Sequence, residues 1–151
     1  MQFPYKTILC PIDFDDESIH ALEMAVEIAR HFGAAVFLVH AIPLIGEGVP
    51  ISLDPYLELE KAAKVKLNRI ANQKLPGVQC ECLVYTGDVI GSILLAMEKI
   101  QPDLLVIATH GRTGLTRFVL GSMAEAVVRK ATCPVLTIRR EEAAGHAKSA
   151  N

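Results

Sequence analysis

Apolar residues along this 151-residue chain fall into two alternating patterns. Short stretches rich in β-branched residues predict strands, and the longer stretches between them repeat apolar residues at helical spacing. Strands that alternate with helices in this way are typical of an α/β domain with a mainly parallel sheet. The predicted strands are 6–12, 35–41, 79–85, 103–108 and 134–138.

The apolar pattern also predicts where each strand lies in the sheet. Four of the strands are nearly continuous in apolar residues, which favours burial on both faces, whereas 79–85 alternates and is expected at an edge. The first predicted helix begins near the acidic group 15–17, which suits a helix N-terminus, and ends at Gly33. The other predicted helices are 57–74, 89–99 and 122–130.

Two segments do not follow the alternation. The connection 42–55 holds three prolines and two glycines and is long for a loop between a strand and a helix, so it is either a lid or a mobile connection. The tail 141–151 is small and polar, which predicts disorder. A single domain over 1–140 is therefore expected.

Composition narrows the class of protein. Hydrophobic residues make up 51% of the chain and aromatic residues only 5%, so the core is expected to be aliphatic. A net charge of -2 gives no basic surface of the kind that binds nucleic acid or an anionic membrane. Because we find neither a signal peptide nor an apolar run of membrane-spanning length, a cytoplasmic protein is expected.

The four cysteines are predicted to be free thiols. Cys10, Cys80, Cys82 and Cys133 are too scattered to form a disulfide framework. Cys80 and Cys82 point to one face of a strand, but no nearby pair of cysteines or histidines completes a structural zinc site.

The residues that follow the strands are the place to look for chemistry, since parallel sheets bind ligands beyond their carboxyl ends. Asp13 follows the first strand; it is either a ligand contact or an acceptor of local backbone N–H bonds. After the fourth strand, Gly111 allows close backbone approach and Gly121 leads into a helix, an arrangement that suits a phosphate. Ser122 and Glu125 also fit a capping box, which explains them without a ligand.

The segment 108–127, ATHGRTGLTRFVLGSMAEAV, resembles the universal stress protein family. Nucleotide-binding members carry Gly, two residues, Gly, nine residues, Gly, then Ser or Thr. Gly111, nine intervening residues and Gly121-Ser122 match this pattern, but Ala108 stands at its first glycine. The resemblance extends over about residues 4 to 140 through YKTILCPIDFDDES, ALEMAVEIAR, TGDVIGSI, PDLLVIATHG and ATCPVLTIRR.

The resemblance implies a fold and a site. The fold is a three-layer, doubly wound α/β sandwich of the adenine nucleotide alpha hydrolase-like, Rossmann-like type, with a five-stranded parallel sheet in the order 3-2-1-4-5. The ligand is ATP, with Mg²⁺ or Mn²⁺ bridging its phosphates to Asp13 or touching only water. The residues implied to border the nucleotide are Pro11, Ile12, Asp13, Ala41, Ile107, Ala108, Gly111, Arg112, Gly121, Ser122 and Met123.

Charges and histidines near this site are few. Arg112 and Arg117 are the cations closest to the proposed phosphates, and the chain lacks the lysine motif of a P-loop, so backbone amides are expected to hold the phosphates. His110, in the phosphate loop, is the histidine suited to a site role, namely orienting the loop. His40, in an apolar strand, is expected to be buried and hydrogen bonded rather than a ligand.

Three functions are compatible with these residues. The first is a nucleotide-responsive stress module that signals its state to an unidentified protein partner. The second is a protein of the same fold that acts through protein–protein contacts alone, and Ala108 is the residue that distinguishes it from the first. The third is a slow ATPase, or a protein that phosphorylates itself on Thr113, Thr116 or Ser122, although no catalytic base is evident.

The last strand is expected to join two copies of the chain. Family resemblance implies a homodimer in which this strand pairs with its counterpart across a two-fold axis. The residues of this dimer edge are Pro134, Val135, Leu136, Thr137 and Ile138.

Overall fold

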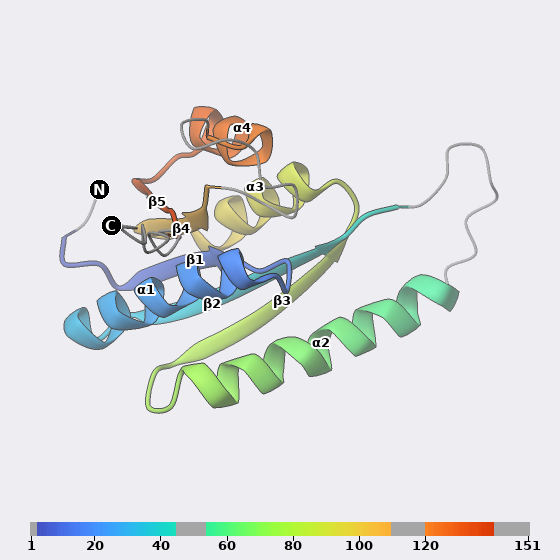
Figure 1. The fold of residues 1–151 in the computed structure, drawn as a ribbon, viewed down its shortest axis with the longest axis horizontal. Helices are drawn as coiled ribbons and strands as arrows, with labels where there is room; N and C mark the ends of the chain where they lie inside the picture. Colours follow the sequence, from blue (N-terminus) through green and yellow to red (C-terminus); the bar gives the residue numbers. More distant parts are fainter. Residues whose placement is uncertain (1–2, 45–53, 110–119, 141–151) are drawn as a thin grey trace, which may run out of the picture.

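The computed structural model describes residues 3–44, 54–109 and 120–140. Within them, strands and helices alternate along the chain, as the apolar pattern predicts (Figure 1). The elements are β1 (Thr7–Pro11), α1 (Asp16–Phe32), β2 (Ala35–Ile42), α2 (Asp54–Lys74), β3 (Cys80–Thr86), α3 (Val89–Ile100), β4 (Leu104–Ala108), α4 (Ser122–Lys130) and β5 (Val135–Ile138).

All strand pairs are parallel, and the sheet has the order β3-β2-β1-β4-β5. This arrangement confirms both the expected strand order and the prediction that the third strand lies at an edge. The connection between β2 and α2 is shorter than predicted, because Ile42 is the last residue of β2 and Asp54 and Pro55 begin α2. Residues 45–53 of that connection lie outside the described part of the chain.

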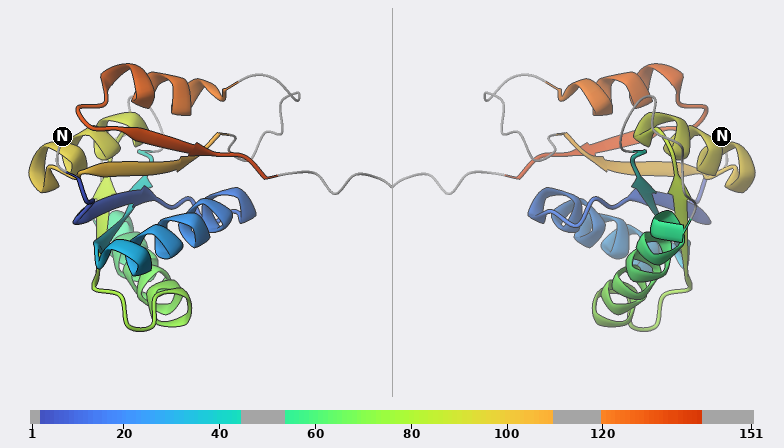
Figure 2. Two further views of the ribbon diagram at one scale, coloured as in Figure 1. Left: turned by 90° about the vertical axis from the view of Figure 1, so that its left-hand side faces the viewer. Right: turned by 90° about the vertical axis from the view of Figure 1, so that its right-hand side faces the viewer.

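Helices cover both faces of the sheet and make three layers (Figures 1 and 2). On one face, Leu22 of α1 and Leu67 of α2 pack in the same buried cluster as Leu38. On the other face, Ile93 of α3 and Val127 of α4 are buried with strand residues that include Leu9 and Leu105. Successive residues of a strand point to opposite faces, so near-continuous apolar strands supply both cores.

Local signals set the limits of α1. The Asp15 carboxylate caps its N-terminus by accepting a hydrogen bond from the Ser18 N–H at 2.7 Å. Gly33 ends the helix in the left-handed conformation, with a φ of 68°, and its N–H donates to the Ala29 carbonyl. Both features agree with the acidic group and the glycine seen in the sequence.

Helix α2 runs along β3 at one edge of the sheet (Figure 1). The Lys64 ammonium donates to the backbone carbonyl of Cys82, and the Thr86 hydroxyl donates to the Glu60 carboxylate at 2.7 Å. Side chains of the helix therefore occupy polar groups of an edge strand, which would otherwise be open to pairing with another chain. None of the helices in the described residues is long and apolar enough to cross a bilayer.

Candidate functional site

A cleft opens at the carboxyl ends of β1, β2 and β4, which are the three central strands of the sheet. It encloses about 500 Å³, its open mouth included. The chain leaves β1 and β4 toward opposite faces of the sheet, so the cleft lies at the point where the connections diverge. The residues predicted from the sequence that line it are Pro11, Ile12, Asp13, Ala41, Ile107, Ala108 and Met123.

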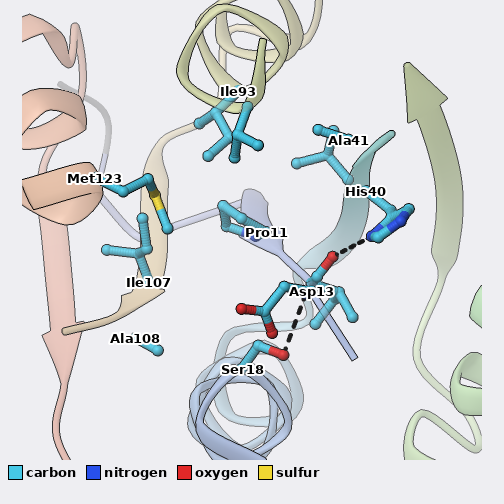
Figure 3. Close-up of a pocket in the computed structure, with 12 residues that line it drawn as sticks. Pro11, Asp13, Ser18, His40, Ala41, Ile93, Ile107, Ala108 and Met123 are labelled. Atoms are coloured by element: carbon cyan, nitrogen blue, oxygen red, sulfur yellow. Dashed lines mark hydrogen bonds between the residues drawn. The ribbon is translucent and has the colours of Figure 1, made fainter. Parts of the chain in front are cut away.

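The walls of the cleft are mainly apolar. In Figure 3, Ile107 and Met123 lie on one side of Pro11, Ala41 and His40 lie on the other, and Ile93 lies above it. The first side comes from β4 and α4, the second from the end of β2, and Ile93 comes from α3. Apolar walls of this kind are typical of small-molecule sites.

The turn between β1 and α1 holds Asp13 at the floor of the cleft. Its carboxylate accepts a hydrogen bond from the Asp15 N–H at 3.0 Å, and its own N–H donates to the Ser18 hydroxyl at 3.3 Å (Figure 3). The alternative of Asp13 as a local backbone acceptor is therefore realised in the structure. Since Asp13 also lines the cleft, the same contacts fix a carboxylate where a ligand would lie.

A second carboxyl group lies beside Asp13. Burial, together with the neighbouring Asp13 carboxyl, raises the pKa of Asp15 to about 6. Asp15 Oδ2 is buried and has no hydrogen-bond partner among the described residues. The two carboxyl groups give this end of the cleft an acidic character, which favours hydrogen-bond donors or a cation there.

His40 has a larger role at the cleft than the sequence suggested. It is half-buried rather than buried, and it lines the cleft. Its Nδ1 lies 2.7 Å from the Ile12 carbonyl oxygen, and because that oxygen only accepts, Nδ1 carries the proton. The His40 ring packs against the Phe14 ring, with centroids 4.4 Å apart. The ammonium of Lys66, a residue of α2, lies 4.2 Å from the Phe14 centroid.

The start of α4 borders the cleft. Met123, in the first turn, lines it, and the Gly121 N–H donates to the Thr109 carbonyl at 2.8 Å, which ties the helix start to the end of β4. The first N–H groups of a helix have no intrahelical partner and carry the positive end of its dipole. Gly121 and Ser122 lie next to the cleft lining without being part of it.

The predicted capping box of Ser122 and Glu125 is wrong. Gly121, not Ser122, is the N-cap, and no side chain in the described part of the protein caps the helix. The Glu125 carboxylate accepts instead from the Arg129 guanidinium at 2.8 Å, one turn further along. The helix start therefore leaves its N–H groups without the side-chain acceptor that the sequence suggested.

Several predicted site residues lie outside the described residues. They belong to the segment that joins β4 to α4, and they are His110, Gly111, Arg112, Thr113, Thr116 and Arg117.

Other lining residues were missed from the sequence. Val89 and Ile93 come from the start of α3, and Ser18 comes from the first turn of α1. Val89 and Ile93 are four residues apart and thus share a helix face, but this spacing indicates burial without showing against what. Across the described residues, no group of three or more histidine, cysteine, aspartate or glutamate side chains is placed to hold a metal ion.

Comparison with known proteins places the chain in a family. The family model described as the universal stress protein family matches residues 4–139. The chain belongs to the universal stress protein family. It is 34% identical over 143 residues to a universal stress protein of Methanocaldococcus jannaschii, with 90% of this chain and 83% of the relative covered. It is 36% identical over 143 residues to one from Thermus aquaticus, with 89% and 99% covered.

Solved structures share the fold of this universal stress protein. The protein UspA from Lactobacillus plantarum matches with a TM-score of 0.71 at 25% identity, covering 89% of this chain and 98% of that one. A universal stress protein in complex with cAMP matches at 0.65 and 22% identity, with 89% and 97% covered. One from Archaeoglobus fulgidus in complex with dAMP matches at 0.59 and 23%, with 88% and 97% covered.

Proposed function

We propose that this universal stress protein binds an adenine nucleotide, ATP in the first instance, in the cleft between β1, β2 and β4, and that it acts as a nucleotide-responsive regulatory module. The observation that carries the proposal is the joining of an apolar cleft, a carboxylate and a helix N-terminus at one point of the sheet. Two structural neighbours whose complexes contain cAMP and dAMP support the adenine class of ligand.

The apolar walls suit the base. Ile107 on one side and Ala41 on the other offer aliphatic surface to both faces of a planar ring. Burial of the flat base supplies affinity without requiring a specific charge in the protein.

The start of α4 suits the phosphates. Its free N–H groups and the positive end of its dipole attract an anion, and Gly121 brings the backbone close to the cleft without a side chain. The buried methyl group of Ala108 takes the place of a hydrogen at the family's first glycine. If this methyl group hinders the phosphates, the protein would instead act through protein contacts alone.

A divalent cation would come with the nucleotide. Asp13 is the carboxylate of the cleft lining, and Mg²⁺ is usually held by one or two carboxylates together with phosphate oxygens and water. Asp13 thus fits as a single protein ligand, and when bound the ion would neutralise part of the phosphate charge.

The phosphate end is tested by a pair of variants at one position. Gly121 has a φ of -56°, a backbone conformation that other residues adopt without strain, and both Asp and Asn are favourable N-caps. Gly121→Asp adds a negative charge beside the phosphates, and Gly121→Asn adds the same shape without the charge. Calorimetry on nucleotide-stripped protein should show ATP binding at least about tenfold weaker for Gly121→Asp than for Gly121→Asn, with adenosine binding equal in both.

The adenine end is tested by narrowing the cleft. Ala41→Phe fills the space beside β2, and Ala35→Phe makes the same change on the same face at the other end of the strand. We expect Ala41→Phe to abolish adenosine and ATP binding and Ala35→Phe to retain both. If neither the wild-type protein nor Ala108→Gly binds ATP, cAMP or dAMP at millimolar concentration, nucleotide binding is refuted. If Ala108→Gly binds a nucleotide and the wild-type protein does not, the function through protein contacts is favoured.

We further propose that β5 pairs with β5 of a second copy to make a homodimer. The backbone carbonyls of Pro134 and Ile138 accept hydrogen bonds from the N–H groups of Leu105 and Thr109. The backbone polar groups of even-numbered residues of β5 therefore point toward β4, and the Thr137 N–H points away from it. Thr137→Pro removes that outward donor and leaves the pairing with β4 intact. Sedimentation should give a dimer for wild-type protein and a folded monomer for Thr137→Pro; a wild-type monomer would refute the proposal.

A further inference from the structure

Cys80 and Cys82 form a pair of thiols that the nucleotide cleft does not use. They are two residues apart in β3 and share a face of the sheet, where they pack against the cluster that contains Leu38. The Cys80 thiol donates a hydrogen bond to the Glu81 carbonyl between the two cysteines, at 3.9 Å. Both lie at the start of β3, at the edge of the sheet, whereas the cleft lies at the carboxyl ends of the central strands.

The pair is open to small ligands from solution. Cys80 and Cys82 line a second cavity of about 640 Å³, its open mouth included, between the end of α2 and the start of β3. Asn68 and Asn72, one turn apart on α2, supply polar walls. Cys80 is half-buried, whereas Cys82 is buried.

A positive charge lies beside the pair. The Lys64 ammonium of α2 donates a hydrogen bond to the backbone carbonyl of Cys82. A cation at this position stabilises an anionic complex formed by the two thiols.

Cys10 and Cys133 differ from the pair in their surroundings. Cys10 is fully buried, and burial raises its pKa to about 12. Burial also raises the pKa of Cys133, which packs on the opposite face of the sheet. Because Cys133 lies on the opposite face from the pair, it serves as a matched control.

The spacing of the pair selects the kind of chemistry. Residues i and i+2 of a strand have Cα atoms about 6.6 Å apart, at the long limit for a disulfide. A structural zinc site needs about four ligands, and the described residues hold no group of three around a common point. A soft monovalent cation takes two sulfur ligands and needs neither a short Cα separation nor further side chains.

We propose that Cys80 and Cys82 together bind a soft monovalent metal cation, for which Cu(I) is the probe, through their two sulfur atoms at this cavity. Binding forms two metal–sulfur bonds and releases the proton of each thiol to water, with no change in oxidation state. The complex carries one net negative charge, which the Lys64 ammonium offsets from α2.

The test is competition for Cu(I) between the fully reduced protein and bathocuproine disulfonate under anaerobic conditions, followed by the visible absorbance of the chelator complex. Wild-type protein and Cys133→Ser should each withdraw a single equivalent of Cu(I). Cys80→Ser and Cys82→Ser should each bind at least about tenfold more weakly, since even the loss of an outer hydrogen bond to a metal ligand costs that much.

Two further measurements keep the outcome clear. Circular dichroism establishes whether each variant is folded. If the change at buried Cys82 unfolds the protein, Cys80→Ser, at a half-buried position, still provides the test. Equal Cu(I) retention by wild-type protein and folded Cys80→Ser would overturn the proposal, as would formation of a Cys80–Cys82 disulfide in air with no Cu(I) bound by the reduced protein. ATP binding should be unchanged in Cys80→Ser, so this test fails or succeeds independently of the nucleotide cleft.

Discussion

Replacing Asp15 by Asn should stabilise the protein at neutral pH, although Asp15 caps α1. Asn is as good an N-cap as Asp and keeps an acceptor for the Ser18 N–H. What it removes is a negative charge that burial and the Asp13 carboxyl disfavour in the folded state. The amide therefore imitates the protonated form of Asp15, which the folded protein prefers.

The size of the effect follows from the pKa. A rise from the ordinary value of 3.8 to about 6 corresponds to about 3 kcal/mol at most. Solvent screens a carboxyl that is only half-buried, which reduces the expected gain to about 1 kcal/mol. This pKa already includes the favourable hydrogen bond from Ser18, so no further term for the cap is subtracted.

The pH dependence has a definite sign. Because the folded pKa lies above the unfolded one, the folded state binds a proton that the unfolded state does not between about pH 6 and pH 3.8. The contribution of Asp15 to stability is thus present at acid pH and is lost as the pH rises through about 6. Asp15→Asn should flatten this part of the stability curve.

Urea unfolding followed by circular dichroism, at about pH 4.5 and about pH 7.5, measures both effects. Asp88→Asn is the matched control: Asp88 caps α3 by accepting the Gly91 N–H at 2.7 Å, and it is exposed. At neutral pH, Asp88→Asn should lower the free energy of unfolding by roughly 0.3–1 kcal/mol, because it removes a charge that the helix dipole favours, whereas Asp15→Asn should raise it. A loss of stability at neutral pH for Asp15→Asn, equal to that of the control, would refute the reasoning.

Two further predictions concern the fold. Gly33→Ala should lower the free energy of unfolding by about 1 kcal/mol in urea titrations, because Gly33 has a φ of 68°, where an L-residue is strained. The strain comes from the backbone alone, since no atom lies within 4 Å of the added Cβ. An unchanged unfolding midpoint would contradict this prediction. Leu38→Ala should lower the free energy of unfolding by about 2–5 kcal/mol, since Leu38 is 0% exposed on the strand between β1 and β3. Met24→Ala, at an exposed position, should change it by no more than about 0.5 kcal/mol. Equal losses for the two variants would contradict the burial of Leu38.

The strands, the helices and most of their limits could be predicted from the sequence, because their signals are local. β-branched runs, apolar spacing, the acidic group before α1 and Gly33 all act within a few residues of one another. The residues that follow β1, β2 and β4 were recognised as a common site for a related reason. In a parallel sheet the carboxyl ends of strands meet at one edge, so the topology brings Asp13, Ala41 and Ile107 together.

Contacts between distant segments were decided only by the tertiary structure. Ser122 and Glu125 have capping-box spacing, yet Gly121 is the N-cap, because the tie of Gly121 to Thr109 sets where α4 starts. His40 lines the cleft, where its ring is held by the carbonyl of Ile12, the residue that follows β1. The Lys64 ammonium of α2 contacts the Cys82 carbonyl, although Lys64 lies eighteen residues earlier in the chain. Charge and hydrogen bonding act over a few ångströms in space, so packing determines them and sequence spacing alone does not.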